Sequence, residues 1–279
     1  MFELYAPAQE TGLALWPVLV VVAFMIALNV VNNRIAPQTH FLLWAFGSSV
    51  VLVAIGLLDG NSWTDMGLSW RFGLRGLFWA GLTIALVTIA YAIASSFKKT
   101  REAFHDERYA QMSGGRLVFQ TLLEVPFGTV LMEEIAFRAV LFSMLARRYG
   151  VIWGLVISSV LFGLWHILPS IGTHESNPAL GGVAGEGRKG NVIAVALSVL
   201  TTSVAGVIFV GLRLVSGSIL GPMGLHWATN GLGYFFSFFL IRIRDRAAAG
   251  IEELVHHHEE KGPDHGDQET RPGETSRGE

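Results

Sequence analysis

Seven stretches of this chain are apolar over about the length that a bilayer crossing requires. A transmembrane helix needs about 20 such residues, because each residue adds about 1.5 Å across a hydrocarbon core of about 30 Å. Only 15% of the side chains are charged, against about 25% in an average soluble protein. The predicted fold is therefore an all-α, polytopic transmembrane helix bundle. Its candidate spans are Leu13–Val31, Phe41–Leu58, Leu77–Phe97, Leu117–Leu145, Val151–Leu168, Asn191–Leu212 and Ser218–Ile241.

The fourth stretch, Leu117–Leu145, is too long for one simple crossing and contains Pro126. Proline removes an intrahelical hydrogen bond, and broken backbone is tolerated at membrane depth where it lines a cavity. Two half-helices that enter and return would give eight spans, whereas one kinked crossing gives seven. Basic loops favour the cytoplasm, which places the loop Lys98–Arg116 inside and the N-terminus outside. The half-helices would also place Arg147 and Arg148 inside, and the single crossing would place them outside.

Charge is distributed unevenly along the chain and suggests three regions. Residues 242–279 carry 16 of the 42 charged side chains, so we expect a polar, disordered tail there. Residues 1–116 read as N-terminal transmembrane helices with a cytoplasmic loop, and residues 117–241 as the functional membrane core. The Gly-rich stretch 170–190 is expected to be a flexible loop between spans.

Several classes of function are excluded by residues that the chain lacks. It has no cysteine, so a thiolate metal site or a cysteine nucleophile is ruled out. It contains neither the His-Glu-x-x-His pattern of zincin proteases nor a Walker-type glycine loop, and no Gly-x-Ser-x-Gly nucleophile elbow. Without a basic stripe, nothing points to nucleic acid as a partner.

A short set of ionisable side chains falls inside the apolar stretches. Such a group at the bilayer centre costs about 2.5–3.5 kcal/mol even on insertion scales, so it should face a protein interior or a water-filled cavity and mark a functional site. The bundle is therefore expected to enclose a polar cavity. The residues concerned are Glu124, Glu133, Glu134, Arg138, His166 and His226.

Glu133, Glu134 and Arg138 form the densest part of this set. Glu134 and Arg138 are four residues apart, so on a helix they share a face, in the favourable order of acid before base. An internal ion pair between them would let both lie within the membrane. Glu133 points about 100° away on a helix of 3.6 residues per turn and has no partner in this segment. It is the candidate general base.

Two other stretches supply histidines at helical spacing. Phe162 and His166 share one face of a helix, as do His226 and Asn230. If the three helices converge, Glu133 and His166 can hold a water molecule while His226 and Asn230 donate hydrogen bonds to an oxyanion. Alternatively, Glu133, His166 and His226 can bind zinc, since two histidines and a glutamate form a known catalytic set. Either arrangement activates water for attack on an amide carbonyl.

Together these segments resemble the CPBP family, which comprises type II CAAX prenyl proteases and bacteriocin-processing or self-immunity (Abi) proteins. The family pattern is Glu-Glu-x-x-x-Arg, Phe-x-x-x-His and His-x-x-x-Asn or Asp, each on a membrane helix. The chain matches all of it, in order, between about Leu117 and Phe239. The resemblance implies an intramembrane endopeptidase. In that family role, Glu133 and His166 activate water, and His226 and Asn230 stabilise the oxyanion. Glu134 supports the site with Arg138 as its partner, and Phe162 is structural.

The resemblance leaves the cofactor and the substrate open. The family is commonly called a metalloprotease family, and work on relatives favours a metal-free glutamate mechanism, so zinc or another divalent metal and no metal are equal alternatives here. Eukaryotic relatives cut prenylated CAAX proteins, whereas we expect a peptide or membrane-protein substrate, contact with membrane lipid and a bacterial cell membrane. A proton-coupled transporter and a non-catalytic immunity or scaffold protein are the alternative functions. The sequence is silent on oligomeric state.

Overall fold

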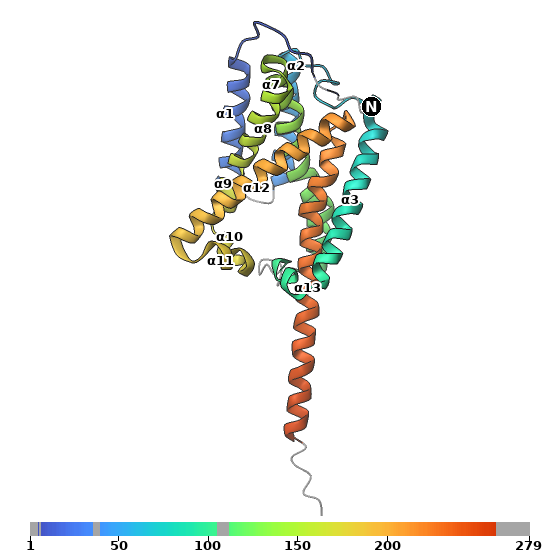
Figure 1. Cartoon of the computed structure of the whole chain (residues 1–279), viewed down its shortest axis with the longest axis vertical. Coiled ribbons are helices and arrows are strands. Elements are labelled where there is room, and N and C mark those ends of the chain that lie inside the picture. Colours follow the sequence, from blue (N-terminus) through green and yellow to red (C-terminus); the bar gives the residue numbers. More distant parts are fainter. Residues whose placement is uncertain (1–4, 6, 36–39, 105–111, 261–279) are drawn as a thin grey trace, which may run out of the picture. The chain divides into compact units, whose positions relative to one another are not determined.

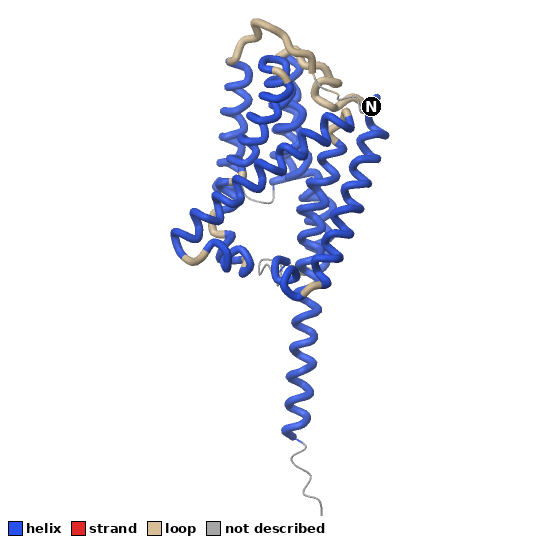
Figure 2. Tube along the Cα trace, viewed as in Figure 1, coloured by secondary structure: helices blue, strands red, loops and turns tan. Residues whose placement is uncertain are grey.

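The computed structural model describes residues 5, 7–35, 40–104 and 112–260, and helices make up most of them (Figure 2). Because no strand occurs among these residues, the predicted all-α class is confirmed. The chain divides into two units, 1–240 and 241–279. The principal helices are α1 (Trp16–Val30), α2 (Phe41–Leu58), α3 (Gly73–Ser96), α4 (Lys98–Arg101), α5 (Gly114–Phe119), α6 (Leu131–Glu134), α7 (Phe142–Tyr149), α8 (Val151–Trp165), α9 (Ile167–Ser170), α10 (Thr173–Ser176), α11 (Pro178–Ala184), α12 (Gly187–Ser216) and α13 (Leu220–Glu260).

Five helical stretches in the described part of the chain are long and apolar enough to cross a membrane. They begin and end close to five of the predicted spans and are Trp16–Ile35, Phe41–Leu58, Trp70–Ser96, Val151–Ser170 and Gly187–Ser216. The predicted spans Leu117–Leu145 and Ser218–Ile241 are not among them. Both are helical but carry the polar side chains of the site, which lowers their apolarity. The count of seven or eight spans therefore stays a prediction.

Residues 114–149 form one uninterrupted helical run, which agrees with the single crossing and contradicts the alternative of two half-helices. Two π-helical segments, η6 (Gln120–Val130) and η7 (Ile135–Leu141), alternate with α5, α6 and α7. Pro126 lies inside η6. Proline has no N–H for the carbonyl five residues earlier, and this carbonyl, that of Thr121, accepts from the Trp227 indole at 2.8 Å instead.

Arg147 and Arg148 end this run, and their charges are used in ion pairs. The guanidinium of Arg147 donates to Glu10 at 2.7 Å, and that of Arg148 donates to both oxygens of Asp59 at 2.6 and 2.7 Å. Asp59 directly follows α2, so both arginines lie with the start of α1 and the end of α2. The two arginines therefore join the end of this run to the segments before α1 and after α2. Because their charges are paired, they are a poor indicator of the side of the membrane on which they lie.

The close approach of α8 and α12 depends on small residues. A Cβ atom at Gly163 would lie 2.0 Å from the Ser203 hydroxyl, and one at Gly206 would lie 2.9 Å from the Ser159 backbone. Small residues let membrane helices pack backbone to backbone. Figure 1 shows α8 packed between α7 and α12. This packing fixes the end of α8, where His166 lies.

Two regions expected to be irregular contain helix. The Gly-rich stretch 170–190 forms the short helices α10 and α11 before α12 begins. Asn177 caps α11 by accepting a hydrogen bond from the Leu180 amide at 3.1 Å. The predicted tail is helical through Glu260, as the end of α13. Residues 261–279, and Arg108 of the predicted cytoplasmic loop, lie outside the described residues.

The continuous run predicts on which side of the membrane residue 149 lies. The chain has no native cysteine, so single cysteines can be labelled cleanly. We expect Tyr149→Cys and Ser62→Cys to react with an impermeant maleimide from one side, and Lys99→Cys from the other. Labelling of residue 149 from the same side as residue 99 would restore the pair of half-helices.

Candidate active site

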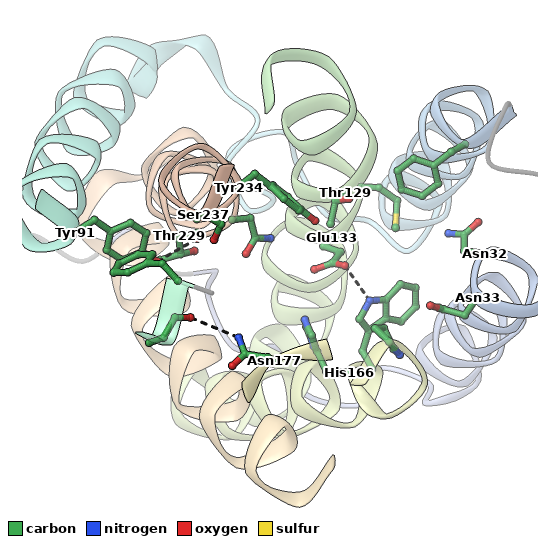
Figure 3. Close-up of a pocket in the computed structure, with 18 residues that line it drawn as sticks. Asn32, Asn33, Tyr91, Thr129, Glu133, His166, Asn177, Thr229, Tyr234 and Ser237 are labelled. Carbon is green, nitrogen blue, oxygen red and sulfur yellow. Dashed lines mark hydrogen bonds between the residues drawn. The ribbon is translucent and has the colours of Figure 1, made fainter. Parts of the chain in front are cut away.

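A cavity of about 660 Å³ lies among helices of the first unit, and Glu133 and His166 both line it. Figure 3 shows the two side chains near its centre, with Tyr91 toward one end and Asn32 and Asn33 toward the other. The lining is rich in uncharged polar groups, including Asn230, and Glu133 is its one carboxylate among the described lining residues. The structure thus contains the polar cavity that the sequence predicted. It brings Glu133, His166 and Asn230 to the same space.

Glu133 is 5% exposed, and its two oxygens have different surroundings. Oε1 accepts a hydrogen bond from the Trp165 indole nitrogen at 3.0 Å (Figure 3). Oε2 has no hydrogen-bond partner in the described structure, and the His226 Nε2 atom lies 3.7 Å from it. That separation exceeds a hydrogen bond. One oxygen of this carboxylate is therefore fixed, and the other is buried without a hydrogen-bond partner.

Glu134 lies on the same helix but is completely buried, at 0% exposure. Its Oε1 atom accepts from the Arg138 guanidinium at 3.0 Å, so the predicted ion pair is confirmed. The same oxygen lies 2.8 Å from the His226 Nδ1 atom, which donates to it. Glu134 therefore joins its own helix to α13. The sequence predicted the first of these contacts, and only the folded chain provides the second.

Aromatic rings enclose the charges of this pair. The Arg138 guanidinium carbon lies 3.8 Å from the centre of the Phe162 ring and 4.6 Å from that of Phe209. The Phe209 ring also stacks on His226, with centroids 5.0 Å apart. Cation–π contacts of this kind gain strength when desolvated. Phe162 and Phe209 therefore both cover the Arg138 guanidinium, and Phe209 was not among the predicted site residues.

His166 follows the last residue of α8, and one hydrogen bond fixes its ring. Its Nδ1 atom lies 2.8 Å from the Phe162 carbonyl oxygen. A carbonyl only accepts, so Nδ1 carries the proton and Nε2 of the neutral ring has a free lone pair. The predicted spacing of Phe162 and His166 therefore has a second function, since the backbone of the first residue sets the tautomer of the other.

The predicted alternative of a zinc ion on Glu133, His166 and His226 does not fit this arrangement. No group of three His, Cys, Asp or Glu residues in the described ranges is placed to hold a metal ion. We therefore derive no step through a metal.

Two contributors to the site, Trp165 and Phe209, were not singled out from the sequence. Trp165 directly precedes His166, so its place within a motif was the available signal. It was hidden because tryptophans in a membrane protein ordinarily serve as interfacial anchors. Phe209 lies in a uniformly apolar helix and has no distinguishing signal. Glu124, by contrast, pairs with Arg116 at 2.8 Å outside the cavity lining.

Two Arg–Glu pairs in residues 114–149 allow a matched test of burial. Arg138→Gln leaves the buried Glu134 without its guanidinium, which should cost about 3–5 kcal/mol. Arg116 is 42% exposed, so Arg116→Gln should cost at most about 1 kcal/mol. Thermal unfolding of both purified variants in detergent measures the difference. Equal losses would mean that the buried cluster does not stabilise the fold.

Comparison with known proteins identifies the region that holds the site. No curated protein and no solved structure was found to match the chain. Residues 115–232 match the family model described as type II CAAX prenyl endopeptidase Rce1-like. This stretch contains every predicted site residue from Glu133 to Asn230, and the five apolar helices agree with a membrane protein. The chain is therefore an integral membrane protein, and its residues 115–232 are similar to the Rce1-like type II CAAX prenyl endopeptidases.

Proposed function

We propose that the protein is an intramembrane endopeptidase that hydrolyses a peptide bond of a membrane-associated or peptide substrate. The observation that carries this proposal is the meeting of Glu133 and His166 in one cavity, each with an atom that has no hydrogen-bond partner in the described structure. A water molecule between this carboxylate oxygen and the imidazole Nε2 can lose a proton to either. Proposed domain roles follow, with residues 117–241 as the catalytic core and 1–116 as its supporting helices.

The reaction needs a base, a site for the oxyanion and a proton for the leaving amine. Glu133, assisted by His166, takes a proton from water while the water oxygen attacks the carbonyl carbon of the substrate. The resulting oxyanion is stabilised by His226 and by the Asn230 amide, which has no hydrogen bond to the described protein and faces the cavity. As the C–N bond breaks, the proton passes to the amine nitrogen.

The buried charges support the role given to His226. Glu133 and Glu134 are two carboxylates in a cluster whose permanent cation is Arg138. A protonated His226 balances the cluster, because its Nδ1–H stays on Glu134 and its Nε2–H becomes a donor for the oxyanion. Glu134 and Arg138 would then act by holding His226 in place, and their support requires no contact with substrate.

Loss of the base should abolish hydrolysis while the fold remains. We expect Glu133→Gln and His166→Ala each to lower kcat at least about 100-fold, the usual scale for general-base catalysis. Glu124→Gln is the matched control, because Glu124 lies outside the cavity lining. Purified variants in proteoliposomes are assayed with an internally quenched peptide, beside their thermal unfolding. A Glu133→Gln protein with normal turnover would refute the assignment.

The description of the matched family names CAAX prenyl substrates, so a prenylated peptide is compared with the same peptide without the prenyl group. The probes are two internally quenched peptides that end in Cys-Val-Ile-Met, one S-farnesylated and one S-methylated. We expect both to be cleaved, because half of the residues that line the cavity carry an amide or hydroxyl that can bind a peptide backbone. Cleavage of the farnesylated peptide alone would instead define a prenyl-dependent enzyme.

A further inference from the structure

The indole of Trp165 has no part in the proposed chemistry, yet it contacts the proposed base directly. Trp165 is 8% exposed, and its Nε1–H donates to Glu133 Oε1 at 3.0 Å. The Phe137 ring packs edge-on against the indole, with centroids 5.7 Å apart. The donor is thus held in a fixed orientation. Because Trp165 precedes His166, one turn of the chain presents both the imidazole and the group that holds the carboxylate.

A second contact attaches this turn to α1, outside the family-matched residues 115–232. The Asn29 amide donates to the Trp165 carbonyl oxygen at 2.8 Å, and both groups are buried. Asn33 donates in turn to the Asn29 side-chain oxygen at 3.1 Å. The carbonyl at this position is at the end of α8, where helical carbonyls lack an intrahelical partner. Helix α1 therefore supplies the hydrogen-bond donor for the Trp165 carbonyl oxygen and fixes the turn that carries Trp165 and His166.

We propose that Trp165 and Asn29 are positioning residues, which hold Glu133 so that its free oxygen serves as the base. This inference rests on the proposed function. Oε1 is fixed by the indole, so the carboxylate cannot turn toward His226. Without the indole N–H, the carboxylate is free to close the 3.7 Å gap to the His226 Nε2 atom. That ion pair would withdraw the base from water.

The sharpest test removes the N–H and nothing else. Replacing the Trp165 side chain with the isosteric benzothiophene analogue, by nonsense suppression, should lower kcat at least about 10-fold and leave KM unchanged, because the carboxylate loses the donor that fixes its orientation. Trp153→Phe is the control, because Trp153 is 60% exposed on the same helix. An unchanged kcat for the analogue would overturn the proposal.

Asn29 is tested by its coupling to Trp165. We expect Asn29→Leu to lower kcat less than the analogue does, and the double replacement to be no worse than the analogue alone. If Asn29 and Trp165 acted independently, the fold-decreases in kcat would multiply in the double replacement. That outcome would overturn the proposal that Asn29 acts through Trp165. The readout is kcat against the quenched peptide, with thermal unfolding of each variant measured in parallel to exclude loss of fold.

A measurement without turnover separates this inference from the proposed function. In ¹⁵N-tryptophan-labelled protein, the Trp165 indole resonance, assigned with Trp165→Phe, should shift in Glu133→Gln because its acceptor loses charge. Glu124→Gln should leave it in place. A resonance unmoved in Glu133→Gln refutes the contact whether or not any peptide is cleaved. If the resonance shifts in Glu133→Gln but the unmodified protein cleaves no peptide, the proposed function is refuted and the contact is retained.

Discussion

The buried contact among Glu134, Arg138 and His226 is the interaction on which the rest of the site depends. A carboxylate at 0% exposure within an apolar bundle is tolerable only when its charge is balanced. Arg138 supplies the balance from the same helix and His226 supplies a donor from α13. One ion pair thereby makes the segment compatible with the membrane and also joins it to the helix that carries Asn230.

Close helix packing brings the third element to this pair. Gly163 and Gly206 let α8 and α12 approach until a Cβ atom would no longer fit. The end of α8 then presents His166, with its tautomer set by the Phe162 carbonyl. Aromatic rings of Phe162 and Phe209 cover the Arg138 guanidinium. Charge, packing and orientation therefore act together, because the same short segments provide all three.

Much of the site followed from residue type and spacing. Intramembrane charges are so costly that Glu133, Glu134, Arg138, His166 and His226 stood out against an apolar background. The spacing of four predicted the Glu134–Arg138 pair and the shared face of Phe162 and His166. The signs of charge were less informative in the loops. Arg147 and Arg148 have the basic character typical of a cytoplasmic loop, but in the structure they form ion pairs with Glu10 and Asp59, which are distant in sequence.

The sequence by itself determined the helical class, the apolar spans and the identity of the polar residues that a membrane has to accommodate. The tertiary structure decided which of their atoms are used. It paired Oε1 of Glu133 with Trp165 and left Oε2 without a hydrogen-bond partner, and it set His226 against Glu134. It did not gather the predicted zinc ligands into a metal site among the described residues. Local spacing cannot specify such choices. They depend on hydrogen bonds between residues 32 and 92 positions apart on different helices, whose geometry exists only once the helices have packed.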